Sequence, residues 1–176
     1  IGAKEAAAMT ALGLHALQHR GQEACGIVSF DGQEFYARRG IGHVAQVFAA
    51  NTLLGELPGD MASGHVRYST TGGSGLRNIQ PLHADLARGG FSIAHNGNIS
   101  NAMALKTELV SKGAIFQSTS DTEVIIHLIA TSRFPKLLDR FVDALRMVEG
   151  AYSLICMTPK RMVACRDPLG IRPLVM

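Results

Sequence analysis

The sequence predicts an α+β fold in which helices are layered on antiparallel sheets. Two hairpins, one near each end of the chain, indicate antiparallel pairing, because parallel strands need long crossovers. The first joins residues 25–30 to residues 33–39 through Asp31-Gly32, and the second joins residues 151–157 to residues 162–165. Helical patterns arrive in pairs between the strand groups, and no glycine-rich dinucleotide or phosphate loop follows a strand.

Each further element follows from a local pattern. Alanine and leucine at helical spacing predict the first helix, and Gly113 is typical of a helix C-terminus. Ser120 and Glu123 have the spacing of a capping box, which predicts a helix start at Ser120. Helices are expected over residues 5–19, 101–112 and 120–131 and from Pro135 onward, and further strands over residues 61–68 and 91–94.

Composition excludes several classes of protein. The 176 residues can bury the core of one domain, and 47 % hydrophobic with 18 % charged residues predicts a globular chain. No apolar run approaches the roughly 20 residues of a membrane span, and no signal peptide opens the sequence. The net charge of +3 comes from scattered residues, which argues against nucleic acid. Widely spaced cysteines predict a reducing, cytoplasmic compartment, and the histidine spacing predicts no metal site in this segment.

The stretch His95-Asn96-Gly97-Asn98 follows the apolar run of residues 91–94 and allows two interpretations. Asn-Gly is a strong signal for a tight hairpin turn. A strand that ends in Asn-Gly can also direct one side-chain amide and one backbone N–H at the same point. Two such donors stabilise a tetrahedral oxyanion.

Two other segments favour the oxyanion interpretation. Arg67 ends a predicted strand and shares a face with His65, so its guanidinium can bind a carboxylate in fixed geometry. Residues 69–75 are serine, threonine and glycine only, as a lid over a polar ligand would be. Asp121 lies in the first turn of a predicted helix and is a candidate counter-ion for an ammonium group, because Ser120 and Glu123 can supply the cap.

These candidates predict a ligand that is an amino acid. Arg67 would bind its carboxylate, Asp121 its ammonium, and Asn96 with Gly97 an oxyanion formed on its side chain, so a side-chain amide fits. A nucleophile is missing from this set. Cys25 is the nearest cysteine, and nothing adjacent in the sequence would activate it.

The chain resembles the glutaminase domain of the amidophosphoribosyltransferases, glutamine-dependent enzymes that open purine biosynthesis. The matching runs lie at residues 16–23, 64–74, 95–98, 120–123 and 166–174, and they span nearly the whole chain. The resemblance implies a glutaminase domain over residues 1–176 with an amino-terminal-nucleophile hydrolase fold. Such a fold is a four-layer αββα sandwich of two antiparallel sheets between helical layers.

The resemblance also implies roles for individual residues. Arg67 and Asp121 are expected to hold the carboxylate and ammonium of glutamine, and Asn96 with Gly97 is expected to form the oxyanion hole. Residues 67–78 resemble a loop that closes over glutamine, with Thr70 in contact with it. Arg20 and His65 are expected to support the site.

The family's nucleophile is an amino-terminal cysteine whose own amine serves as the base. Alignment on His19-Arg20-Gly21 places it about six residues before Ile1. We therefore expect this polypeptide alone to bind glutamine weakly and not to hydrolyse it. The family's phosphoribosyltransferase domain is expected after Met176, with magnesium there, an iron–sulfur cluster in some members, and assembly into a homo-oligomer.

Two other interpretations of the sequence remain open. Glucosamine-6-phosphate synthase shares the Ser-Asp-Thr-Glu and His-Asn-Gly runs, but it usually has Tyr-Asp and Trp where this chain has Gln22-Glu23 and Tyr68. A non-catalytic glutamine-binding domain that has lost its nucleophile is the second alternative. The amino terminus of the full-length protein distinguishes it from an enzyme.

Overall fold

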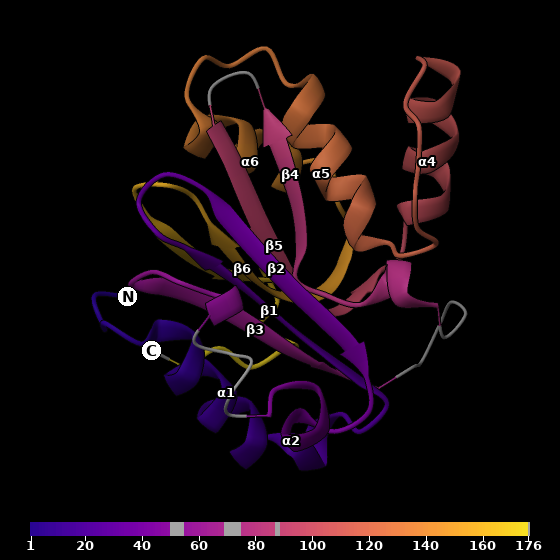
Figure 1. Ribbon diagram of the computed structural model, residues 1–176. Helices are drawn as coiled ribbons and strands as arrows, with labels where there is room; N and C mark the ends of the chain where they lie inside the picture. The colour runs from indigo at the N-terminus through magenta and orange to yellow at the C-terminus, as the bar shows by residue number, and fades with distance from the viewer. Residues whose placement is uncertain (50–54, 69–74, 87–88, 176) are drawn as a thin grey trace. The chain divides into compact units, whose positions relative to one another are not determined.

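The computed structural model describes residues 1–49, 55–68, 75–86 and 89–175, and it is an α+β structure (Figure 1). Its strands form two sheets, with strand orders β2-β1-β3 and β4-β5-β6-β7. Antiparallel pairs join β1 to β2, β1 to β3 and β4 to β5, which confirms the predicted fold class. In chain order the elements are α1 (Ala6–Ala16), η1 (Gln18–Arg20), β1 (Ala24–Phe30), β2 (Phe35–Ile41), α2 (Val44–Val47), β3 (Met61–Arg67), η2 (Leu76–Asn78), β4 (Leu82–Leu86), β5 (Gly89–Ile99), α4 (Ala102–Ser111), α5 (Thr122–Thr131), α6 (Leu137–Leu145), β6 (Gly150–Met157) and β7 (Met162–Arg166).

The chain divides into two compact units, and the first comprises residues 1–94 and 155–163. In this unit the two faces of β1 pack against different partners, because successive side chains of a strand point to opposite sides. Cys25 and Ile27 belong to one buried cluster with Leu14 of α1, and Val44 and Val47 of α2 add to it. Val28 packs on the other side with Met157 of β6. The three-stranded sheet is therefore covered on both faces within this unit.

The second unit comprises residues 95–154 and 164–176. Here α5 packs against both α4 and α6, and its apolar face is fully buried at Val124, Ile125 and Ile129. The unit also contains the C-terminal half of β5 and the first half of β6, which are neighbours in the four-stranded sheet. Among the helices in the described part of the chain, none has the length and apolar character that crossing a membrane requires.

Three elements differ from the sequence prediction. Strand β4 was not predicted, because this five-residue edge strand is too short for its apolar-polar alternation to be decisive and it depends on pairing with β5. The single-turn helix α2 is too short to show helical periodicity. Strand β5 continues through Asn96 and Gly97 to Ile99 instead of ending at Asn96, so the candidate oxyanion donors lie within a strand.

Candidate functional site

Gly97 lies in β5 with a positive φ of 153°, a conformation that L side chains rarely adopt. A Cβ atom added there would lie 2.1 Å from the carbonyl oxygen of Ala151 and 2.8 Å from the Cα atom of Tyr152. Glycine is therefore required because β6 approaches β5 closely at this point. The hairpin-turn interpretation of Asn96-Gly97 is wrong, since the strand runs on through both residues.

Asp121 precedes α5, and its carboxylate holds the segment that contains Asn96 and Gly97. Its Oδ2 accepts a hydrogen bond from the backbone N–H of Ile99 at 2.9 Å, and its Oδ1 lies 3.6 Å from Nδ1 of His95. The carboxylate therefore contacts residues on both sides of the Asn96-Gly97 pair. Its side chain nevertheless stays 26 % exposed, which leaves part of it accessible to a ligand.

The pKa of Asp121 is lowered from its ordinary value of 3.8. Burial by itself would raise this pKa, but the hydrogen bond and charge of His95 and the N–H groups of Ile99 and Thr122 outweigh burial. The carboxylate is therefore ionised at neutral pH. An ionised, partly exposed carboxylate can bind an ammonium group.

The predicted capping box between Ser120 and Glu123 is wrong. The Glu123 carboxylate accepts hydrogen bonds from the backbone N–H groups of Gln117 and Ser118, at 2.8 Å and 2.7 Å, and from the Ser118 hydroxyl. Glu123 thus fastens the loop that leads into α5 and does not cap the helix itself. Asp121 occupies the N-cap position without a side-chain capping bond, and its Oδ2 instead accepts the Ile99 N–H while part of the carboxylate stays exposed.

His95 is a structural member of this site that the sequence analysis did not single out. Its side chain is 1 % exposed, and its Nδ1 lies 3.0 Å from Oγ1 of Thr122, which is itself fully buried. Its Nε2 would lie 2.9 Å from a Cβ atom at Gly97. The imidazole therefore fills the space between α5 and the glycine. Its position directly before Asn96 in a buried strand was the one available signal.

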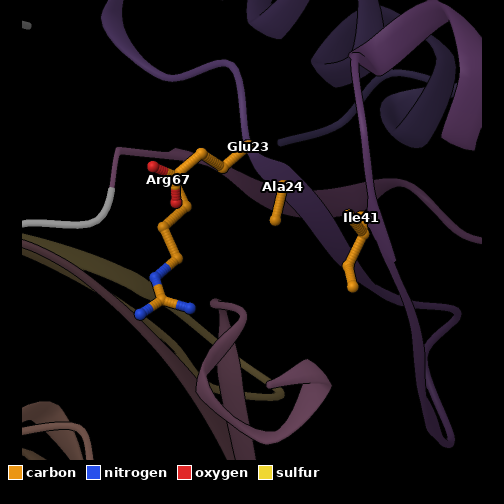
Figure 2. A pocket seen from close by; sticks show the side chains of 4 residues that line it. All are labelled: Glu23, Ala24, Ile41 and Arg67. Carbon is orange, nitrogen blue, oxygen red and sulfur yellow. The ribbon is translucent and has the colours of Figure 1, made fainter. Parts of the chain in front are cut away.

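Arg67 belongs to the first unit and ends β3 opposite Ala24 of β1. The residue is only 9 % exposed and lines a pocket of about 290 Å³ together with Glu23, Ala24 and Ile41 (Figure 2). Backbone atoms of Arg67 would lie 2.7 Å from a Cβ atom on Gly21, so the segment before β1 packs directly on the end of β3. These contacts fix the base of the Arg67 side chain.

The other site residues predicted in the first unit are His65, Arg20 and Thr70. His65 pairs with Gly26 in register, two residues before Arg67 and on the same face of β3. Arg20 is exposed in η1, adjacent to Gly21. Thr70 and most of the predicted lid lie outside the described residues. The structure therefore groups Arg67 with His65 in one unit, and Asn96, Gly97 and Asp121 in the other.

Arg172 and Asp167 are two further residues, linked by hydrogen bonds to Asn96 and to each other, that local sequence patterns did not indicate. A guanidinium nitrogen of Arg172, Nη2, donates a hydrogen bond to Oδ1 of Asn96. Asp167, which is 2 % exposed, accepts the backbone N–H of Arg172 at 3.0 Å. Both residues fall in one of the runs that carried the family resemblance, but their separation from Asn96 by more than 70 positions hides the contact.

Comparison with known proteins shows which family the chain matches. A family model described as a glutamine amidotransferase domain matches residues 65–176. The amidophosphoribosyltransferase of Rhizobium etli is 57 % identical over 176 residues, which are 100 % of this chain and 36 % of the relative. The amidophosphoribosyltransferase of Lacticaseibacillus casei is 45 % identical over 175 residues, which are 99 % of this chain and 90 % of the relative.

Solved structures give the same result. The glutamine phosphoribosylpyrophosphate amidotransferase of B. subtilis, solved in complex with ADP and GMP, has a TM-score of 0.90 and 45 % identity to this chain. The match covers 98 % of this chain and 37 % of that one. The chain thus spans about a third of the length of the first relatives that it matches. The α+β fold is that of these amino-terminal-nucleophile enzymes.

Proposed function

The chain belongs to the glutamine amidotransferase domains of the amidophosphoribosyltransferase family, and from this premise we propose that it takes ammonia from glutamine. In the intact protein, that ammonia would react with phosphoribosyl pyrophosphate to give 5-phosphoribosylamine, the first step of de novo purine biosynthesis. The relatives' shared name and the whole-chain match support this assignment over that of glucosamine-6-phosphate synthase.

The observation that carries the proposal is the hydrogen bond between Asp121 and the N–H of Ile99. It fastens a partly exposed, ionised carboxylate to the strand segment that contains Asn96 and Gly97. We assign Asp121 to the ammonium of glutamine, and the Asn96 amide with the Gly97 N–H to the oxyanion formed on its side chain. Donors fixed in place before the reaction stabilise that oxyanion without reorganisation.

Arg67 is assigned to the α-carboxylate of glutamine. Its guanidinium can give two parallel hydrogen bonds to a carboxylate, and its buried base limits the rotamers available to it. His65 and Arg20 are assigned supporting roles in the same unit, and Thr70 a contact from the closing loop. The pocket beside Arg67 supports this part of the proposal.

The reaction needs a nucleophile, which we place at an amino-terminal cysteine about six residues before Ile1. Its thiolate attacks the side-chain carbonyl carbon of glutamine, and the α-amine of the same cysteine accepts the thiol proton. The tetrahedral intermediate collapses as the C–N bond breaks, and the α-ammonium returns the proton to the departing ammonia. Water then hydrolyses the thioester to glutamate and regenerates the thiol.

Other parts of the proposal concern the protein beyond these residues. A phosphoribosyltransferase domain would use the ammonia, with magnesium bound there and an iron–sulfur cluster as a further option. Among the described residues, no three His, Cys, Asp or Glu side chains group as a metal site would need. We further propose a cytoplasmic homo-oligomer, an assignment that rests on the family.

The test is a glutaminase assay on the full-length protein after its amino terminus has been identified by intact mass. We expect an amino-terminal cysteine, glutamate release, and a loss of about 10²–10³ in kcat for Asn96→Ala. Arg67→Ala should raise the KM for glutamine. A mature protein that begins with another residue and releases no glutamate would instead be a glutamine-binding domain, and the enzymatic proposal would be wrong.

A further inference from the structure

The side-chain amide of Asn96 has a specific partner in Arg172. Nη2 of Arg172 donates to Oδ1 of Asn96, and both residues belong to the second unit. Asn96 is itself exposed, so strand packing alone does not fix the rotation of its terminal amide. The Arg172 contact is therefore an added constraint on which amide atom faces which direction.

The chemistry of arginine makes this constraint directional. A guanidinium has five N–H donors and no acceptor, so it can bind only the oxygen of an asparagine amide and never its NH₂ group. We infer that Arg172 is a positioning residue that holds the Asn96 amide with its Nδ2 donors turned toward the developing oxyanion. This inference rests on the proposed oxyanion role of Asn96.

Arg172 is held in turn by the segment that follows β7. Oδ2 of Asp167 accepts the Arg172 backbone N–H at 3.0 Å and the Tyr152 N–H at 3.4 Å, and the Asp167 N–H donates to the Tyr152 carbonyl at 2.8 Å. Tyr152 is also the residue whose Cα atom packs against Gly97. Both proposed oxyanion donors are therefore held by contacts that lead to Tyr152 of β6. Gly97 packs directly against Tyr152, and Asn96 is connected to it through Arg172 and Asp167.

A direct contact of Arg172 with substrate is the competing interpretation. The Nε atom of Arg172 is buried, and among the described residues it meets no hydrogen-bond acceptor. If that atom bound glutamine, loss of the side chain would raise the KM. A residue that acts through Asn96 lowers kcat and leaves the KM for glutamine unchanged, because the oxyanion exists only after attack.

The experiment is a double-mutant cycle on the full-length enzyme with Arg172→Ala, Asn96→Ala and the double variant. We expect Arg172→Ala to lower kcat by about tenfold or more, up to the 10²–10³ that loss of an oxyanion donor costs. The double variant should be no slower than Asn96→Ala alone, because Arg172 has no function once the amide is gone. Multiplied losses, a raised KM or an unchanged kcat for Arg172→Ala would each overturn the inference.

Two further variants separate positioning from charge and from folding. Arg166→Ala removes an equal charge from the start of the same segment, and we expect it to leave kcat within about twofold of wild type, a ratio that corresponds to a surface effect. Arg172→Lys keeps a cationic donor, so it should recover part of the lost rate. If Arg172→Ala fails to fold, Arg172→Lys takes its place in the cycle. A kcat of Arg172→Lys equal to that of the wild type would then show that no guanidinium is needed, and the inference would be wrong.

The cycle also distinguishes this inference from the proposed function. If Asn96→Ala itself changes kcat by less than tenfold, the oxyanion assignment fails and the Arg172 inference fails with it. If Asn96→Ala is slow by 10²–10³ but Arg172→Ala multiplies that loss, only the positioning role of Arg172 is wrong.

Discussion

Asp121 and Asp167, two carboxylates of the second unit, have lowered pKa values, yet they differ in what is left exposed. Asp167 is 2 % exposed, and its two oxygens accept the backbone N–H groups of Ile171, Arg172 and Tyr152. The Asp121 carboxylate accepts the backbone N–H of Ile99 and is also influenced by that of Thr122, yet its side chain stays 26 % exposed. A lowered pKa alone therefore does not mark a ligand site.

The causes of the two shifts explain the difference. The hydrogen bond from the Arg172 N–H contributes most to the lowered pKa of Asp167, and those from Ile171 and Tyr152 add to it against the effect of burial. For Asp121, burial is the largest effect and raises the pKa, and His95 is the leading cause that lowers it. Asp167 is thus a structural carboxylate saturated by backbone donors, whereas Asp121 keeps capacity for a further cation.

Among substitutions of these carboxylates, the largest expected effect comes from Asp121→Asn in the full-length enzyme. The amide oxygen can still accept the Ile99 N–H, but the negative charge for the substrate ammonium is gone. A charged hydrogen bond is worth about 1.5–3 kcal/mol, so kcat/KM for glutamine should fall about 10- to 150-fold. Steady-state kinetics with glutamine and with an analogue that lacks the α-amine would measure it. Equal losses for both compounds would place Asp121 with Asp167 as a structural residue.

Asp167→Ala should act on stability first and on catalysis second. Three backbone N–H groups lose their acceptor, so the segment that carries Arg172 loosens and the melting temperature should fall by several degrees. The KM for glutamine should stay unchanged, whereas kcat should fall several-fold because Arg172 no longer positions the Asn96 amide. Asp167→Asn is the matched control, because its amide oxygen keeps an acceptor and should restore most of the melting temperature. A raised KM would contradict the structural assignment.

Much of the fold could be predicted because its periodicities are local. The hairpin at Asp31-Gly32 formed as expected, with Oδ1 of Asp31 accepting the N–H groups of Gln33 and Glu34 at 2.8 Å each. Strand β4 could not be predicted in the same way, since its position depends on pairing Leu82 with Ile93 and not on its own alternation. Local patterns were sufficient to predict a segment where its own turn residues or its own apolar spacing determine its conformation.

The site was harder to predict because its geometry depends on contacts between distant segments. Asn96, Gly97 and Asp121 were selected from local motifs, and the structure places the Asp121 carboxylate against residues flanking Asn96-Gly97. The Asp121 bond to Ile99 and the Arg172 bond to Asn96 join residues 22 and 76 positions apart, which no local pattern encodes. The roles of all these residues stay predictions.

Both carboxylates should make the folded protein sensitive to acid. A carboxylate with a lowered folded-state pKa stabilises the fold above its unfolded value of 3.8, and that contribution disappears as the pH falls through the folded-state pKa. Melting temperatures measured from about pH 6 down to about pH 2 should therefore fall most steeply below pH 4. Asp121→Asn and Asp167→Asn should each flatten this decline. Asp139→Asn, an exposed position on α6, is the control and should leave the slope as it is.

The smallest expected effect tests a third carboxylate, Glu123, which lies two residues after Asp121 and resembles Asp167 in its bonding. It is 8 % exposed and holds the backbone and the hydroxyl of Ser118. Ser118→Ala removes the hydroxyl bond to Glu123 and the long hydroxyl contact that accepts the Ser120 N–H at 3.2 Å, and it leaves both backbone bonds to Glu123. Unfolding should therefore become easier by about 1 kcal/mol. That corresponds to about 2–4 °C in melting temperature, measured by calorimetry. Glutamine kinetics should not change, because only the loop before Asp121 loosens. A raised KM for glutamine would show that the loop of residues 117–120 belongs to the binding surface, and the division between structural and ligand-binding carboxylates would then fail at Glu123.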